Sequence, residues 1–310
     1  MSVLTSAVDL HSVMLATDFS PSSEKPLRHA VAIARHYGAK FYLAHVVSAL
    51  GLAMAGTDAI NVAEAAATRD ATRLEYDLVN SGALAGVEHH ITIRRGEIWP
   101  ELEAIIREEK IDLIIIGTHG RHGVAKLLLG SVAEQIFRHA DCLVLTVGPG
   151  SYPESHVNND PANRTFLFAT DFGAASLHAL PLAISSANQF RAKLVLLNVI
   201  AEVPLPADSH WPMAGDVMRM RENARTDGIR RLRDLTQNAA IEVQPDFVAE
   251  FGTASRVSDK ILETAERLKV DVIIMGLHRS THIGTASHMP WATAYEVVCQ
   301  ARCPVLTVRE

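Results

Sequence analysis

The chain repeats itself, and this internal repeat limits the possible folds more than any single motif does. The sequence Ala-Thr-Asp-Phe occurs at residues 16–19 and again, 153 residues later, at residues 169–172. Two further pairs of segments match with offsets of 159 and 161 residues: 112–117 with 271–276, and 142–147 with 303–308. Because the offset is constant within segments and grows between them, we infer a duplication followed by small loop insertions.

Each half reads as five strands that alternate with four helices. In the first half the expected strands are 13–17, 41–47, 88–94, 111–116 and 143–147, and the expected helices are 21–37, 59–84, 99–110 and 131–138. Ser20 is expected to cap the first helix and Gly38 to end it. Alternation of this kind requires parallel strand pairing. The predicted fold class is therefore α/β: two tandem doubly wound domains, each a five-stranded parallel sheet with helices on both faces.

The expected boundaries follow from composition. Residues 149–162 are polar and rich in Pro, Gly, Ser and Asn, so they read as a linker between domains 1–148 and 163–310. The net charge of −6 argues against a nucleic-acid partner. We expect neither a membrane span nor a secretory signal, since no long apolar run and no basic leader occur. Three cysteines are too few for a disulfide framework, which favours a cytoplasmic location.

The motif most relevant to chemistry follows the fourth expected strand. That apolar run shows no polar alternation, so we expect it to be buried on both faces. Gly117 and Gly120 then turn the chain, and Gly130 with Ser131 opens a helical pattern. Glycines let backbone N–H groups approach a ligand, and a helix start favours phosphate. A glycine pair alone is more often only a turn, so a phosphate site is inferred here only because of the spacing of the whole motif.

The spacing Gly-x2-Gly-x9-Gly-Ser resembles the ATP-binding signature of the universal stress protein family. The Ala-Thr-Asp-Phe-Ser start, the Ala-His-Val strand end and the closing Val-Leu-Thr-Val strengthen the resemblance, which covers nearly the whole chain as two tandem copies. It implies a fold like that of the adenine-nucleotide α-hydrolases and ATP as ligand, with Mg²⁺ as an optional companion. The residues implied to bind the nucleotide are Ala16, Thr17, Asp18, Val46, Gly117, His119, Gly120, Arg121, Gly130, Ser131 and Val132.

The resemblance also implies how the chain assembles. Members of the family commonly pair through their last strands. In this chain residues 143–147 would then face residues 304–308 and form an internal pseudo-dimer, and two chains would pair again as a homodimer.

The residues themselves leave several roles open. Asp18 would either accept a hydrogen bond from the nucleoside or brace the turn into the first helix. Ser131 would either bind phosphate or cap its own helix, and Arg121 would either neutralise phosphate or be a solvated loop charge. We expect no metal site and no catalytic residue, since no zinc spacing and no Gly-x-Ser-x-Gly elbow occur.

The second copy keeps the spacing of the motif but changes its residues. Arg279 takes the place of the second glycine, Met289 that of the third, and Pro290 that of the serine. The residues left for a second site are Asp171, Val199, Gly276 and Arg279. We expect this site not to hold a triphosphate; whether Arg279 binds a different anion stays open.

The sequence thus predicts an ATP-binding stress-response sensor or regulator, with nucleotide held mainly in the first domain and at most weak ATP hydrolysis. An unidentified protein partner would read its state. The alternatives are a slow ATPase or adenylate-utilising enzyme of related fold, and an interaction scaffold that binds no nucleotide.

Overall fold

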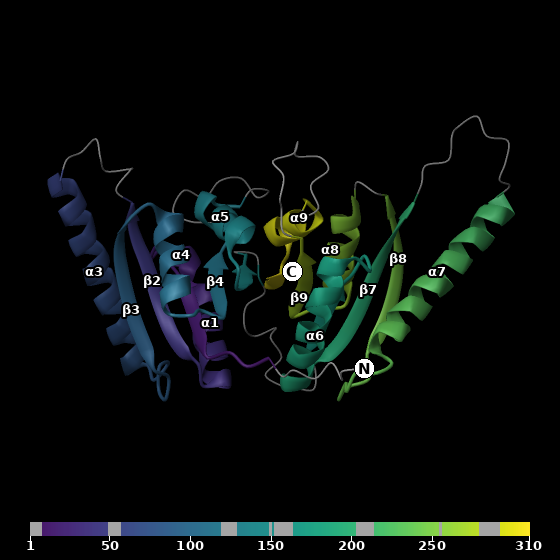
Figure 1. Ribbon diagram of the computed structural model, residues 1–310, viewed down its shortest axis with the longest axis horizontal. Helices are drawn as coiled ribbons and strands as arrows, with labels where there is room; N and C mark the ends of the chain where they lie inside the picture. The colour runs from purple at the N-terminus through teal and green to yellow at the C-terminus, as the bar shows by residue number, and fades with distance from the viewer. Residues whose placement is uncertain are drawn as a thin grey trace. The chain divides into compact units, whose positions relative to one another are not determined.

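The computed structural model describes residues 8–48, 57–118, 129–148, 151, 164–202, 214–253, 256–278 and 292–310 (Figure 1). The chain divides into two compact units. One, here called the N-terminal domain, is Asp9–Pro149; the other, the C-terminal domain, contains Gly150–Glu310 together with Val8. The predicted linker, residues 149–162, lies outside the described residues except for Ser151.

The N-terminal domain alternates strands and helices along the chain. Its elements are β1 (Ser12–Ala16), α1 (Glu24–Tyr37), β2 (Lys40–Ser48), α3 (Thr57–Asn80), β3 (His89–Gly96), α4 (Ile98–Glu108), β4 (Leu113–Gly117), α5 (Ser131–His139) and β5 (Leu143–Val147). The strands pair in parallel in the order β3-β2-β1-β4-β5. The chain moves outward from β1 to β3 and then returns to β4, so the order switches between β1 and β4.

The C-terminal domain repeats this plan. Its elements are β6 (Thr165–Ala169), α6 (Ala174–Gln189), β7 (Lys193–Glu202), α7 (Ala214–Thr236), β8 (Asp246–Thr253), α8 (Val257–Arg267), β9 (Val272–Leu277), α9 (Ala292–Gln300) and β10 (Val305–Arg309). The parallel order is β8-β7-β6-β9-β10. The predicted fold class, two tandem doubly wound α/β domains, is confirmed.

Helices cover both faces of each sheet (Figure 1). Right-handed crossovers place α1 and α3 on one face of the N-terminal sheet and α4 and α5, which contact each other, on the other face. In the C-terminal domain α8 and α9 contact each other in the same way. The central strands are mostly buried, and Met14 and Ile114 in the first sheet, like Leu167 and Ile273 in the second, are inaccessible to solvent. None of the described helices has the length and apolar character that crossing a membrane requires.

Two local predictions need correction. Ser20 was expected to cap the first helix, but its hydroxyl hydrogen bonds to Asp18, and a short 3-10 helix (Pro21–Ser23) precedes α1. The helix α3 was expected to reach residue 84 but ends at Asn80. Turns follow, with Gly82 at φ 71° and Gly86 at φ 74°. Apolar residues continue past the true end of α3, so the periodicity alone does not reveal it.

Candidate functional site

The candidate site lies at the carboxyl ends of β1, β2 and β4, which are neighbours in the N-terminal sheet. In doubly wound sheets ligands bind at this edge, beside the switch in strand order. The fold brings five of the predicted residues to this edge, namely Ala16, Thr17, Asp18, Val46 and Gly117. Of these, Val46 and Thr17 are nearly inaccessible to solvent.

Asp18 braces the turn that follows β1. Its Oδ1 atom accepts hydrogen bonds from the Ser20 amide at 3.0 Å, the Ser20 hydroxyl at 2.5 Å and the Ser23 hydroxyl at 3.0 Å. The next residue, Phe19, has a φ of 58°, which only a well-supported turn imposes on a side chain of that size. The bracing role that the sequence left open is therefore present. A ligand would meet a carboxylate that these bonds already orient.

The exit of β1 is held by a residue to which sequence reasoning gave no role, His45 at the end of β2. Its Nδ1 atom lies 2.7 Å from the carbonyl oxygen of Thr17, and the ring packs 4.9 Å from that of Phe19. Because a carbonyl oxygen only accepts, Nδ1 must carry the proton in this contact. A signal was available: the second copy has Asn198 at this position, and histidine and asparagine share a side-chain N–H donor.

A hydrogen bond closes the base of the loop between β4 and α5. The amide of Gly130 donates to the carbonyl oxygen of Thr118 at 2.9 Å, while the amide of Thr118 donates to Val147 at 3.2 Å. Thr118 is buried. The start of α5 is thereby fixed beside the end of β4, as a phosphate-binding loop requires.

The first turn of α5 rules out one of the two roles expected for Ser131, that of helix cap. Gly130 is the residue that precedes the helix, and Ser131 is already its first residue. Ser131 therefore does not cap its own helix, and Gly130 has no side chain that could bond the first N–H groups. Ser131 and Val132 form the first turn of α5, whereas His119, Gly120 and Arg121 lie outside the described residues.

The C-terminal domain builds the same turn with different residues. The Oδ1 atom of Asp171 accepts hydrogen bonds from the Gly173 amide and the Ser176 hydroxyl, both at 2.8 Å. Burial opposes ionisation of this carboxyl, but its hydrogen bonds, together with the charge of the His278 side chain, outweigh burial and lower the pKa of Asp171. Asn198 donates to the carbonyl oxygen of Thr170 at 2.9 Å, as His45 does in the first copy.

Gly276, at the end of β9, has a packing role that is independent of any ligand. A Cβ atom at this position would lie 2.0 Å from the carbonyl oxygen of Ala175 and 2.7 Å from the amide nitrogen of Ser176. The start of α6 therefore approaches the strand so closely that only glycine fits. Its presence in the second copy does not indicate a phosphate site. Val199 is placed on β7 as Val46 is on β2, and Arg279 lies outside the described residues.

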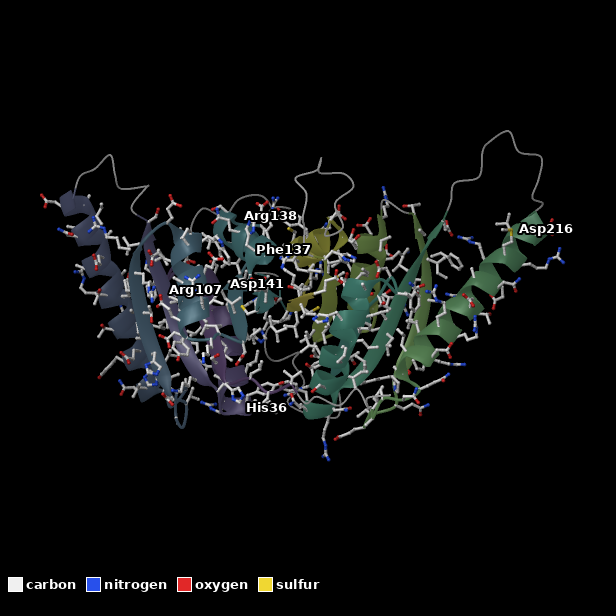
Figure 2. The ribbon with its side chains drawn as sticks, viewed as in Figure 1. His36, Arg107, Phe137, Arg138, Asp141 and Asp216 are labelled. Carbon is white, nitrogen blue, oxygen red and sulfur yellow. The ribbon has the colours of Figure 1, made fainter. Side chains whose placement is uncertain are left out.

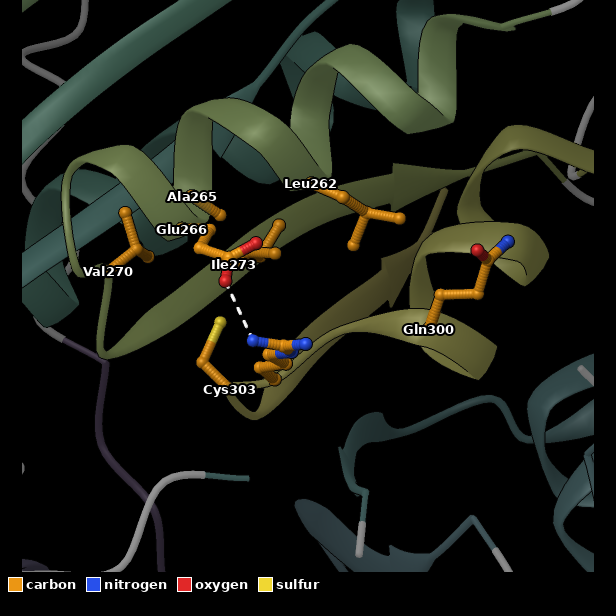
Figure 3. A pocket seen from close by; sticks show the side chains of 8 residues that line it. Leu262, Ala265, Glu266, Val270, Ile273, Gln300 and Cys303 are labelled. Atoms are coloured by element: carbon orange, nitrogen blue, oxygen red, sulfur yellow. Dashed lines mark hydrogen bonds and ion pairs between the residues drawn. The ribbon is translucent and has the colours of Figure 1, made fainter. Parts of the chain in front are cut away.

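A small pocket in the C-terminal domain lies at the opposite end of its sheet (Figure 3). Its volume is about 60 Å³, and its lining includes Val270, Arg302 and Cys303, which come just before β9 and β10. Ligand pockets for nucleotide-sized molecules measure roughly 300–1,000 Å³. This pocket is therefore not the candidate site.

Comparison with known proteins shows which family the chain resembles. The model of the "Universal stress protein family" matches residues 10–148 and again 162–309. A universal stress protein of Methanocaldococcus jannaschii is 30% identical over 139 residues, which is 44% of this chain and 80% of that protein. The crystal structure of a universal stress protein from Archaeoglobus fulgidus covers 96% of this chain and 98% of its own, with 19% identity and a TM-score of 0.62.

A universal stress protein solved in complex with cAMP matches 46% of this chain and 98% of its own, at 26% identity and a TM-score of 0.31. The two matches of the family model correspond to the two halves found from the internal repeat and together cover most of the chain. The chain belongs to the universal stress protein family, as two tandem copies.

Proposed function

We propose that the N-terminal domain binds ATP. The observation that carries this proposal is the hydrogen bond between Gly130 and Thr118, which places the start of α5 beside the end of β4. It fixes the two ends of the Gly-x2-Gly-x9-Gly-Ser signature at the edge of the sheet where doubly wound proteins bind ligands. The same edge carries an oriented carboxylate on Asp18 and the end of β2 at Val46.

The proposed roles follow from chemistry. Asp18 would accept a hydrogen bond from the nucleoside, and the backbone at Val46 would contact the base. The N–H groups of the first turn of α5, with the Ser131 hydroxyl, would bind phosphate. Gly120 would allow close approach and Arg121 would offset phosphate charge. Mg²⁺, where present, would be held chiefly by the phosphates themselves.

We also propose that the C-terminal domain does not hold a triphosphate. Its counterpart of the signature carries Arg279, Met289 and Pro290 in place of two glycines and the serine. Proline removes a backbone N–H and methionine adds bulk. The glycine that remains, Gly276, is already explained by its packing against α6.

In this proposal the protein is a nucleotide-dependent sensor or regulator with at most weak hydrolysis. A cytoplasmic location is part of it, since no disulfide joins the three cysteines, all of which lie in the described part of the chain. The homodimer and the pairing of residues 143–147 with 304–308 remain predictions from the family resemblance. A slow ATPase and a scaffold without nucleotide are the alternatives.

Calorimetric titration tests the proposal. ATP, ADP and cAMP would be titrated into the full chain and into two matched variants, Gly130→Arg and Met289→Arg, which place the same bulk at corresponding positions. We expect saturable ATP binding that Gly130→Arg abolishes and Met289→Arg leaves intact. Undiminished binding by Gly130→Arg would contradict the proposal, and many turnovers of ATP during the titration would favour the ATPase.

A further inference from the structure

Two helices, α4 and α8, occupy corresponding places in the two domains. Each has 11 residues, and they begin 159 residues apart. The helix α4 packs over β2 and β3, and α8 packs over β7 and β8. Each buries a small apolar face, which includes Leu102 and Ile105 in α4 and Ile261 and Ala265 in α8. Apolar burial is non-directional, so it hardly distinguishes the correct docking site of each helix from the similar site on the other sheet.

In the N-terminal domain the helix is joined to the sheet by charges. Arg94 of β3 hydrogen bonds to Glu108 near the end of α4, and it lies 3.7 Å from Glu101 near the start of α4. The Arg94 side chain is 27% exposed and that of Glu108 is 51% exposed. A cation on the strand thus faces two anions on the helix. We call these three residues the N-terminal clasp.

In the C-terminal domain the same clasp has the opposite sign. Glu250 of β8 lies opposite Val199, as Arg94 lies opposite Val46. Its carboxylate accepts a hydrogen bond from Arg267 of α8 at 2.8 Å, and the exposures, 27% and 55%, resemble those of the first clasp. Lys260 occupies the helix position of Glu101, and its ammonium group pairs with Glu263 of the same helix at 2.5 Å. We call Glu250, Lys260 and Arg267 the C-terminal clasp.

A second pair of positions on these helices is reversed as well. In the C-terminal domain Arg302 is 2.7 Å from Glu266 of α8 (Figure 3). The corresponding residues of the N-terminal domain are Asp141 and Arg107, both labelled in Figure 2. The cation is therefore on the helix in the N-terminal domain, as Arg107, and before the last strand in the C-terminal domain, as Arg302.

The reversal is not general along the repeat. At the first residue of β2, Lys40 pairs with Glu88 at 3.0 Å; at the first residue of β7, Lys193 pairs with Asp246 at 2.5 Å. Here the two lysines correspond and keep the same sign, although Asp246 lies two residues beyond the counterpart of Glu88. Opposite signs are therefore found where α4 and α8 dock, and not at these lysines.

We propose that the two clasps are a specificity device that lets each sheet accept only its own helix while the chain folds. If α8 docked on the N-terminal sheet, Arg267 and Lys260 would face Arg94. If α4 docked on the C-terminal sheet, Glu101 and Glu108 would face Glu250. Both wrong arrangements bring like charges together, and specificity often rests on such repulsion. Misassembly between similar tandem domains is a characteristic failure of such chains, and this repulsion would oppose it.

The test gives the N-terminal clasp the residues of the C-terminal clasp: Arg94→Glu with Glu101→Lys and Glu108→Arg. The correct pairs remain attractive, but the wrong pairs become attractive too. A background with Trp211→Phe and Trp291→Phe leaves Trp99 of α4 as the reporter, whose ring lies 6.0 Å from that of His139 on α5. We expect an unchanged urea midpoint, and a ratio of misassembled to native chains after refolding that rises about tenfold at low salt.

The dependence of refolding on salt concentration provides an independent test of the proposal. Because screening weakens exposed charge pairs, the misassembled fraction of the unaltered chain should rise with added sodium chloride, whereas that of the variant should change little. The control is Lys193→Asp with Asp246→Lys, which reverses an ion pair between β7 and β8 that involves neither clasp. This control should refold as the unaltered chain does.

Refolding of the clasp variant with the yield of the unaltered chain would overturn the proposal, and would mean that apolar packing alone selects the helix. Should this variant not fold, the reciprocal one replaces it: Glu250→Arg, Lys260→Glu and Arg267→Glu. Arg225→Gln is added there because Arg225 lies 3.8 Å from Glu250.

Discussion

The Nδ1 atom of His45 lies 2.7 Å from the carbonyl oxygen of Thr17, and this contact joins the end of β2 to the exit of β1. In the C-terminal domain Asn198 makes the corresponding bond to Thr170 at 2.9 Å. Different side chains therefore serve one purpose in the two copies. Both hold the backbone in place just before the aspartate that braces the turn.

This relationship predicts that asparagine can replace histidine. His45→Ala should lower the free energy of unfolding by about 1 kcal/mol, the usual net worth of one hydrogen bond, and should weaken ATP binding. His45→Asn should restore most of both. Urea unfolding and calorimetric titration of the two variants check this. If both substitutions had the same effect, the imidazole ring rather than its N–H donor would matter.

Gly276 should tolerate no side chain. A methyl group there would lie 2.0 Å from the carbonyl oxygen of Ala175, so α6 has to shift. Gly276→Ala should lower the free energy of unfolding by roughly 1–3 kcal/mol or more. The control is Gly215→Ala in α7, where a Cβ meets nothing within 4 Å and should be neutral or stabilising. Equal unfolding midpoints for the two variants would contradict the packing role.

Acid should destabilise the protein partly through Asp171. Its hydrogen bonds lower its pKa below the ordinary value of 3.8 despite burial. The ionised carboxylate therefore stabilises the fold above about pH 4, and this contribution is lost as the pH falls through the lowered pKa. Unfolding measured between acid and neutral pH should show a shallower acid loss for Asp171→Asn. An identical pH profile in the variant and the unaltered chain would show that Asp171 does not contribute to the acid destabilisation.

Alkali should destabilise the protein through Cys303. Burial, with a further contribution from the Asp271 carboxylate, raises the pKa of this thiol from 9.0 to about 12. Above pH 9 the unfolded chain loses this proton while the folded chain keeps it, so stability falls as the pH rises towards 12. The slope is at most about 1.4 kcal/mol per pH unit for one thiol.

Cys303→Ala is the variant that measures this contribution. It should be less stable than the unaltered chain near pH 7, because it leaves a cavity, but its stability should decline less above pH 9. Burial also raises the pKa of Cys142 to about 12, so some alkaline decline should persist. A variant that declines as steeply as the unaltered chain would show that Cys303 contributes nothing.

The fold was predictable because the sequence pattern that indicates it occurs in both halves of the chain. Alternation of strands and helices occurs twice, and the offsets of the repeat mark the loops. The end of α3 was not predictable, since apolar residues continue beyond Asn80. The cap of the first helix was misjudged because the hydroxyl of Ser20 bonds to Asp18, a choice that only the turn geometry settles.

The candidate site was predictable in its position but not in its internal bonds. Strand order alone brings Asp18, Val46 and Gly117 to one edge. The role of His45 depends on a contact between two strands, which the sequence signals only through Asn198, a second N–H donor at the corresponding position of the other copy. The packing of Gly276 against the start of α6 likewise depends on a contact between a strand and a helix, so the motif spacing alone does not reveal it.

The amount of nucleotide released when the purified full chain is denatured tests whether the N-terminal domain alone holds ATP. We expect one ATP per chain, none from Gly130→Arg, and an undiminished amount from Met289→Arg. Two ATP per chain held with equal affinity would contradict the proposed difference between the domains. Release of no nucleotide, together with no binding on titration, would contradict the proposed function itself.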